Sequence, residues 1–121
     1  MSKRILAVDD QEDNRRILRD LLTAAGYEVI EAVDGLEGVA RAEAERPDLV
    51  LMDIQLPGID GYEATRRIKT NPVLKAVPVI AVTSYALAGD EDKAMESGCD
   101  AYIAKPFSPR ALLAKVREFL P

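Results

Sequence analysis

The sequence predicts an α/β fold in which a doubly wound, five-stranded parallel sheet is flanked by five helices. Short apolar runs alternate with amphipathic stretches along all 121 residues, as in a series of strand–helix units. Three of these runs are apolar at every position, which is typical of central parallel strands covered on both faces. The length is that of one compact domain, so we expect residues 1–121 to form a single domain.

The predicted strands are short segments bounded by polar or turn-forming residues. The first, third and fourth contain the apolar runs Ile-Leu-Ala-Val, Leu-Val-Leu-Met and Val-Ile-Ala-Val. The second carries two glutamates and is therefore expected at an edge of the sheet. The five segments are residues 4–8, 28–32, 49–52, 79–82 and 101–104.

A helix is predicted after each strand from apolar periodicity and end signals. The first is expected to end at Gly26, the second to span residues 35–45, the third to begin near Gly61, and the fourth to span residues 88–97 and end at Gly98. The fifth has Ser108 as N-cap and Pro109 in its first turn. The apolar faces are predicted to comprise Ile17, Leu18, Leu21, Leu22 and Ala25 in the first helix, Tyr62, Thr65 and Ile68 in the third, and Leu112, Leu113, Val116 and Leu120 in the fifth.

The composition excludes several classes of function. The net charge of −5 argues against a nucleic-acid partner, and the pairs Arg15-Arg16 and Arg66-Arg67 are interpreted as solvated charge. One cysteine, no signal-peptide pattern and no long apolar run favour a cytoplasmic location without membrane insertion. The absence of histidine removes histidine-based catalysis and any role as a phosphohistidine donor.

Polar residues follow the predicted strands at the sheet edge where a doubly wound fold binds ligands. They are Asp9 and Asp10, Asp53, Thr83 and Lys105. Each has a simpler explanation, since an aspartate can cap the next helix and a lysine is mostly solvated. Together, however, three carboxylates favour a hard cation such as Mg²⁺, and a carboxylate can form an acyl phosphate. The set therefore predicts phosphoryl transfer to Asp53.

Four segments resemble the response-regulator receiver domains of two-component signalling, namely residues 8–10, 51–61, 79–84 and 98–107. The resemblance implies a flavodoxin-like sheet of order 2-1-3-4-5 and a cis Lys105–Pro106 bond. It implies that Asp53 is the phosphoacceptor, with Mg²⁺, replaceable by Mn²⁺, as cofactor. Asp10 and the backbone carbonyl of Gln55 would be further metal ligands, and Asp9 would contact the metal through a bound water. Thr83 would form a hydrogen bond with the phosphoryl group, and Lys105 would form an ion pair with it.

The resemblance also implies a switch rather than an enzyme that turns over an external substrate. The domain would catalyse its own phosphorylation and dephosphorylation, with a histidine kinase or histidine phosphotransfer protein as donor. Thr83 would move toward the phosphoryl group and Tyr102 would turn inward, although Tyr102 is equally well a static, half-buried tyrosine. The partner-binding face would lie on the fourth helix, fifth strand and fifth helix, around Tyr85, Leu87, Met95, Tyr102 and Arg110. Gln55 and Tyr85 would limit the hydrolytic water, which predicts a long-lived phosphoryl group.

Alternatives concern the context of the domain more than its chemistry. Met1 lies close to the first strand and no output domain follows, so a stand-alone regulator is expected, similar in its last third to cell-cycle receivers of the DivK type. The alternative is a receiver excised from a larger response regulator or a hybrid histidine kinase. An aspartyl-phosphate phosphatase of the haloacid dehalogenase type lacks its Asp-x-Asp motif here, and a flavin-binding module lacks its phosphate loop.

Overall fold

A single parallel sheet forms the centre of the molecule. The computed structural model describes residues 2–83 and 90–121. Its strands lie in the order β2-β1-β3-β4-β5, so the expected order and the edge position of the glutamate-bearing strand are confirmed. The bounds are β1 Arg4–Val8, β2 Glu28–Ala32, β3 Leu49–Asp53, β4 Val79–Thr83 and β5 Ala101–Ala104. The third and fourth strands each extend one residue beyond the prediction, which places Asp53 and Thr83 on the strands themselves.

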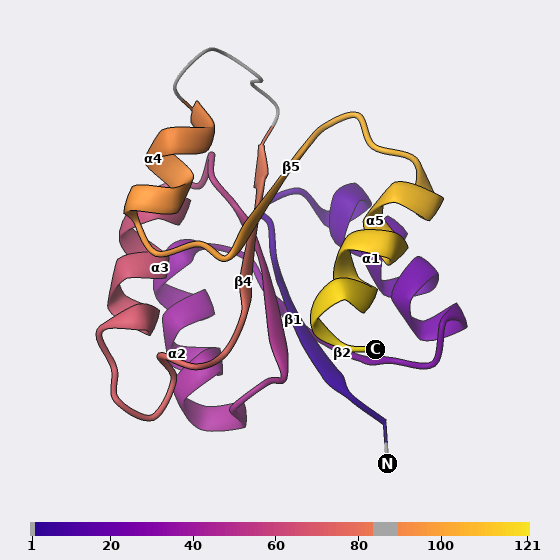
Figure 1. Cartoon of the computed structure of the whole chain (residues 1–121), viewed down its shortest axis with the longest axis horizontal. Helices are drawn as coiled ribbons and strands as arrows, with labels where there is room; N and C mark the ends of the chain where they lie inside the picture. The colour runs from indigo at the N-terminus through magenta and orange to yellow at the C-terminus, as the bar shows by residue number, and fades with distance from the viewer. Residues whose placement is uncertain (1, 84–89) are drawn as a thin grey trace.

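Helices cover both faces of this sheet. They are α1 Glu12–Ala24, α2 Gly35–Glu45, α3 Gly61–Lys69, α4 Asp90–Glu96 and α5 Pro109–Phe119. α1 and α5 lie on one face, and α2, α3 and α4 lie on the other (Figure 1). Side chains of β1, β3 and β4 alternate between two apolar clusters, so that Ile5 packs toward α1 and α5 while Leu6 packs toward the opposite helices. This alternation explains why the central strands are apolar at every position.

The helix ends follow from local sequence. Asp34, Asp60 and Ser108 each accept a hydrogen bond from a backbone N–H in the first turn of α2, α3 and α5, respectively. Gly26 and Gly98 adopt positive φ angles beyond α1 and α4, as helix-terminating glycines do. The residue that follows α2 is instead Arg46, a non-glycine C-cap with φ of 47°. None of the helices described is long and apolar enough to span a lipid bilayer.

Two expectations for α1 were wrong. Ile17 was expected on the buried face but is 58% exposed, because the face packed against the sheet is centred on Leu18 and Leu22. Arg15 was expected to be solvated but is buried beneath neighbouring polar groups. Some expectations above concern residues that the structure does not describe, namely Ser84, Tyr85, Leu87 and Ala88.

Candidate functional site

The register of the sheet brings the strand ends to one level. Val8 pairs with Met52, so Asp9 follows β1 beside the last residue of β3, Asp53. Asp53 in turn pairs with Val82, and Thr83 ends β4 beside Ala104 of β5. The Lys105 N–H then donates to the carbonyl of Thr83 at 2.6 Å. Residues distant in sequence are therefore adjacent at the carboxyl edge of the sheet, as expected for parallel strands.

Three carboxylates meet at this edge. Oxygen atoms of Asp9, Asp10 and Asp53 lie within 4.8 Å of one another. Asp9 and Asp53 are only 2% and 5% exposed, whereas Asp10 is exposed. Asp9 Oδ1 accepts the Gln11 N–H at 2.8 Å, and the N-cap residue of α1, Gln11, makes no side-chain capping bond. The alternative that Asp9 or Asp10 caps α1 is therefore wrong.

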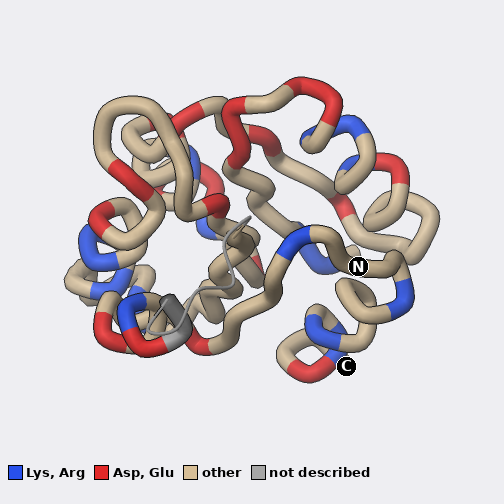
Figure 2. Tube along the Cα trace, turned by 90° about the horizontal axis from the view of Figure 1, so that it is seen from above, with Lys and Arg blue, Asp and Glu red and all other residues tan. Residues whose placement is uncertain are grey.

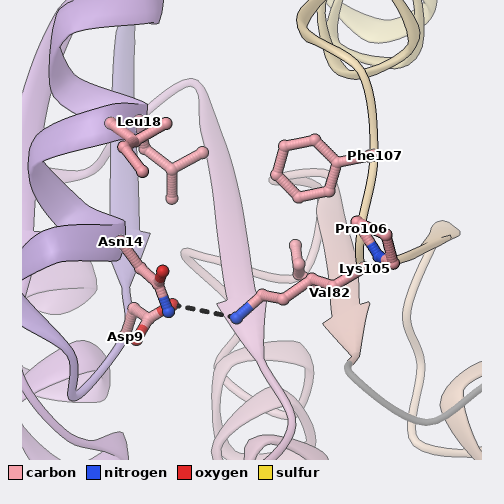
Figure 3. A pocket seen from close by; sticks show the side chains of 8 residues that line it. Asp9, Asn14, Leu18, Val82, Lys105, Pro106 and Phe107 are labelled. Carbon is pink, nitrogen blue, oxygen red and sulfur yellow. Dashed lines mark hydrogen bonds and ion pairs between the residues drawn. The ribbon is translucent and has the colours of Figure 1, made fainter.

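Lys105 supplies the positive charge that faces this cluster. Its Nζ lies 3.2 Å from Asp9 Oδ2 and 3.4 Å from Asp53 Oδ2. The side chain reaches toward Asp9 from the segment after β5, as Figure 3 shows. The Lys105–Pro106 peptide bond is cis, as the resemblance implied. Lys105 is thus not the solvated lysine that it would be in isolation.

The environment of Asp53 raises the pKa of its carboxyl above that of a solvent-exposed aspartate. Burial raises the pKa of the Asp53 carboxyl above its ordinary value, the ammonium of Lys105 lowers it, and the Asp9 carboxylate raises it again. The Gln55 N–H, which donates to Asp53 Oδ1 at 3.1 Å, works in the same direction as Lys105. Since the net shift of the pKa is upward, an added cation would stabilise the ionised form of Asp53.

The donor set fits a hard divalent cation. The three clustered ligands are all carboxylate oxygens, which Mg²⁺ prefers, and neither imidazole nor thiolate is part of the group. An exposed Asp10 beside two buried carboxylates leaves one side of the group open to water, and Mg²⁺ usually retains several waters when bound.

The other predicted site residues lie at the same edge or beside it. Gln55 is exposed just beyond β3, and Thr83 is buried at the end of β4. Tyr102 lies on β5, partly buried, and packs against the apolar cluster on the α2–α3–α4 side of the sheet. Met95 of α4 is 50% exposed, so it is not a core residue.

Sequence reasoning missed two features that shape the site. Gly61 begins α3 directly against β3, and a Cβ atom there would overlap the Asp53 carbonyl and lie 2.7 Å from Ile54 Cα. The sequence marks Gly61 as the start of the third helix and as part of the segment 51–61, but neither signal reveals this close approach. The second feature is a pocket of about 280 Å³ between α1 and the segment after β5. Figure 3 shows Leu18 and Asn14 of α1 on one side of the pocket and Phe107 on the other, with Asp9 and Lys105 at its polar end.

The charges around this edge are mixed. Figure 2 views the molecule from the end that carries the carboxyl ends of the strands, and it shows Lys and Arg positions interspersed with Asp and Glu positions on the helices. Many of these groups form exposed ion pairs within one helix, such as Arg67 with Glu63 on α3. Such pairs contribute little to stability. The carboxylate cluster differs from them because two of its three members, Asp9 and Asp53, are buried.

Comparison with known proteins agrees with this geometry. The family model of the response regulator receiver domain matches residues 5–117. The polar-differentiation response regulator DivK of Brucella anthropi is 44% identical over 120 residues, covering 99% of this chain and 98% of DivK. A response regulator structure from Chloroflexus aurantiacus superposes with a TM-score of 0.95 at 33% identity, covering 99% of this chain and 98% of that one. The receiver domain of a sensor histidine kinase from Pseudomonas aeruginosa, which has a magnesium ion coordinated in its active site cleft, superposes with a TM-score of 0.92 at 37% identity over the same shares.

These likenesses extend over nearly the whole chain and include its sheet order. The resemblance seen in the sequence is confirmed, including the likeness to DivK. Receiver domains of this kind act in two-component signalling, where they interact with histidine kinases or phosphotransfer proteins and with downstream targets. A carboxylate cluster at the carboxyl edge of a 2-1-3-4-5 sheet and a match over residues 5–117 together show that this chain belongs to the response regulator receiver domain family.

Proposed function

We propose that Asp53 is the phosphoacceptor of a magnesium-dependent switch. The observation that carries this proposal is the position of Asp53, a buried carboxylate at the end of a central strand with carboxylates on one side and the Lys105 ammonium on the other. A carboxylate oxygen of Asp53 attacks the phosphorus atom of the donor. The bond from phosphorus to the donor breaks, and the product is an acyl phosphate on Asp53.

The chain's own residues prepare Asp53 for this step. The Gln55 N–H holds Oδ1, which fixes the carboxylate plane, while Oδ2 faces Lys105. Asp9, Asp10 and Asp53 would hold Mg²⁺, which neutralises charge on the carboxylates and the phosphoryl oxygens when it is bound. Lys105 would leave Asp9 to pair with the phosphoryl group, and the Thr83 hydroxyl would donate to it. The magnesium in the related receiver from Pseudomonas aeruginosa supports this choice of cation, and Mn²⁺ is expected to substitute because it also accepts oxygen ligands.

Phosphorylation would change a surface distant from Asp53. It adds roughly 1.5–2 negative charges and three acceptor oxygens. We infer that Thr83 moves toward them and that Tyr102, on the neighbouring strand, follows into the space behind β4. The partner-binding face would then comprise α4, β5 and α5, where Met95 is exposed.

The proposed context is a single-domain regulator. Residues 1–121 would act as one receiver unit in the cytoplasm, and a histidine kinase or phosphotransfer protein would supply the phosphoryl group. The match covers 98% of DivK, which supports a DivK-like receiver as the unit that residues 1–121 form. Slow hydrolysis of the acyl phosphate, with the domain catalysing both its gain and its loss, remains part of the proposal.

Intact-protein mass spectrometry after incubation with acetyl phosphate tests the proposal. The expected result is a labile gain of one phosphoryl group that requires both Mg²⁺ and Asp53. Asp53→Ala should abolish the gain, whereas Asp20→Asn, an exposed change on α1, should leave it intact. A histidine kinase or phosphotransfer protein serves as second donor. If neither donor adds mass to the wild-type chain in the presence of Mg²⁺, Asp53 is not a phosphoacceptor.

A further inference from the structure

Arg15 is buried next to the candidate site. Only 10% of its side chain is exposed, compared with 59% for the adjacent Arg16, although both belong to the same turn of α1. Arginine is rarely buried unless its charge is paired. The contrast between two neighbouring arginines on one helix indicates that Arg15 has a specific set of partners.

Those partners belong to three separate segments. Nη1 donates to the backbone carbonyl of Asp9 at 2.7 Å. Nε lies 3.3 Å from Glu31 Oε1 on the edge strand β2, and Nη2 pairs with Glu12 in the first turn of α1. The planar guanidinium thus joins α1, β2 and the segment that follows β1, which requires its several donors in a fixed arrangement.

The contact with Asp9 matters because of what that carbonyl belongs to. It is part of the peptide group that links Asp9 to Asp10, the two residues that bring carboxylates from this loop. On the preceding peptide, the Asp9 N–H donates to the Ala32 carbonyl of β2 at 3.1 Å. Arg15 and β2 therefore fix successive peptide groups on either side of the Asp9 Cα atom, and with them the directions of both acidic side chains.

Charge alone would give Arg15 the opposite effect on a cation. Glu12 and Glu31 both pair with its guanidinium, so their negative charges are compensated while Arg15 is present. Removing the guanidinium would take from Glu12 its pair with Arg15 and from Glu31 one of two ion pairs, since Glu31 also pairs with Arg19. The more negative potential near Asp9, Asp10 and Asp53 would attract a divalent cation more strongly. A loss of affinity on removing Arg15 would therefore report geometry and not charge.

We propose that Arg15 is a positioning residue that orients the Asp9–Asp10 peptide so that both carboxylates face a shared divalent cation. This proposal rests on the metal-dependent function proposed above. Replacing partners that orient metal ligands typically lowers metal affinity about 10–100-fold. Since Arg15 holds the backbone of the ligand loop and not a ligand atom, we expect the lower end, about tenfold.

The test is a titration of the full chain with MgCl₂. Binding is measured from the backbone amide shifts in ¹H–¹⁵N NMR spectra, which report on folded molecules only. The variants are Arg15→Gln, which removes the charge and the donors that span three segments, and Arg15→Lys, which keeps the charge but not the planar fork. Arg16→Gln is the matched control, because it removes the same charge from the exposed neighbouring position. Glu31→Asp is a milder variant that keeps the charge but shortens the side chain that supports Arg15, and it leaves the loop sequence intact.

The expected result is about tenfold weaker Mg²⁺ binding in both Arg15 variants and unchanged binding in Arg16→Gln. Unchanged or tighter binding in Arg15→Gln would overturn the proposal, and so would full recovery in Arg15→Lys, because charge would then suffice. If the Arg15 variants do not fold, Glu31→Asp decides, because it keeps the charge: weaker binding supports the positioning role and unchanged binding rejects it. If the wild-type chain itself binds no Mg²⁺, the metal-dependent function fails first, and the positioning role fails with it.

Discussion

Replacing Asp53 by asparagine removes one negative charge from the buried carboxylate cluster while keeping the size and shape of the side chain. We expect Asp53→Asn to raise the free energy of unfolding in metal-free buffer at neutral pH. The reason is that the ionised carboxylate is buried, 5% exposed, beside a second buried carboxylate. The residue proposed as the phosphoacceptor would thus be one whose charge destabilises the fold without its cation.

The magnitude follows from the contacts of Asp53. With an effective dielectric constant of 20, attraction to Lys105 at 3.4 Å is worth about 5 kcal/mol, and repulsion from Asp9 at 4.8 Å or less is worth at least about 3.5 kcal/mol. These contributions leave a net attraction of at most about 1.5 kcal/mol, which the exposed Asp10 carboxylate reduces further, whereas burying an ion costs several kcal/mol. We therefore expect the free energy of unfolding to rise by about 1–2 kcal/mol. For a domain of this size, each kcal/mol corresponds to a rise in Tm of roughly 3–6 °C.

The pH dependence has a defined sign. Because burial raises the pKa of Asp53 in the folded state, the folded chain holds this proton more tightly than the unfolded chain. The resulting stabilisation is fully present below the ordinary aspartate pKa of about 3.9 and is lost as pH rises through the higher folded-state value. Asp53→Asn lacks this titration, so its advantage over the wild type should grow with pH across that interval.

Thermal and urea unfolding in EDTA, at several pH values, measure this prediction. Asp20→Asn, which removes a charge from an exposed position on α1, serves as the control and should change stability by less than about 0.5 kcal/mol. Added Mg²⁺ should stabilise the wild type more than Asp53→Asn. An Asp53→Asn variant that is less stable than the wild type in EDTA would refute the reasoning, because burial would then not dominate the energetics of this carboxylate.

Three further substitutions test other parts of the structure. Gly61→Ala should lower the free energy of unfolding by about 1–3 kcal/mol, since its Cβ would overlap the Asp53 carbonyl; equal stability in urea unfolding would contradict the close packing of α3 on β3. Arg46→Gly should raise it by about 0.5–1 kcal/mol because glycine adopts the left-handed φ of 47° without strain, and a lower Tm would be contrary evidence. Lys105→Met removes the ammonium that faces Asp9, so Mg²⁺ should bind about fivefold more tightly, a gain of about 1 kcal/mol, in the same NMR titration, while weaker binding would count against this arrangement.

The fold could be predicted from sequence because its determinants are local. Apolar runs bounded by turns mark the strands, and the capping residues Asp34 and Ser108 mark where helices begin. Even the site followed from a local rule, since residues that end parallel strands must share one edge. The strand ends were placed one residue early at Asp53 and Thr83, because a polar residue that continues a buried strand looks in sequence like the start of a loop.

What could not be predicted depends on partners that sequence periodicity does not reveal. Arg15 is buried because Glu31, on a neighbouring strand, and the Asp9 carbonyl satisfy its donors, and neither contact leaves a periodic pattern. The glutamates of β2 correctly indicated an edge strand, yet they gave no sign that one of them pairs with α1. The expectation that Ile17 is buried was wrong for a related reason. Helical spacing defines an apolar stripe, but the centre of the buried face depends on how the helix is rotated against the sheet.

Both ends of the described chain lie at the end of the molecule opposite the carboxylate cluster. β1 begins there, α5 ends there, and Figure 1 marks N and C on the same lower side, while the strands end at the top. An affinity tag or a tether to a sensor chip attached at either terminus would therefore leave the carboxylate edge facing solution. Binding assays on a surface can therefore compare two immobilised forms, one attached through the N-terminus and one through the C-terminus. Both should bind a candidate phosphodonor equally, because both present the same face to it.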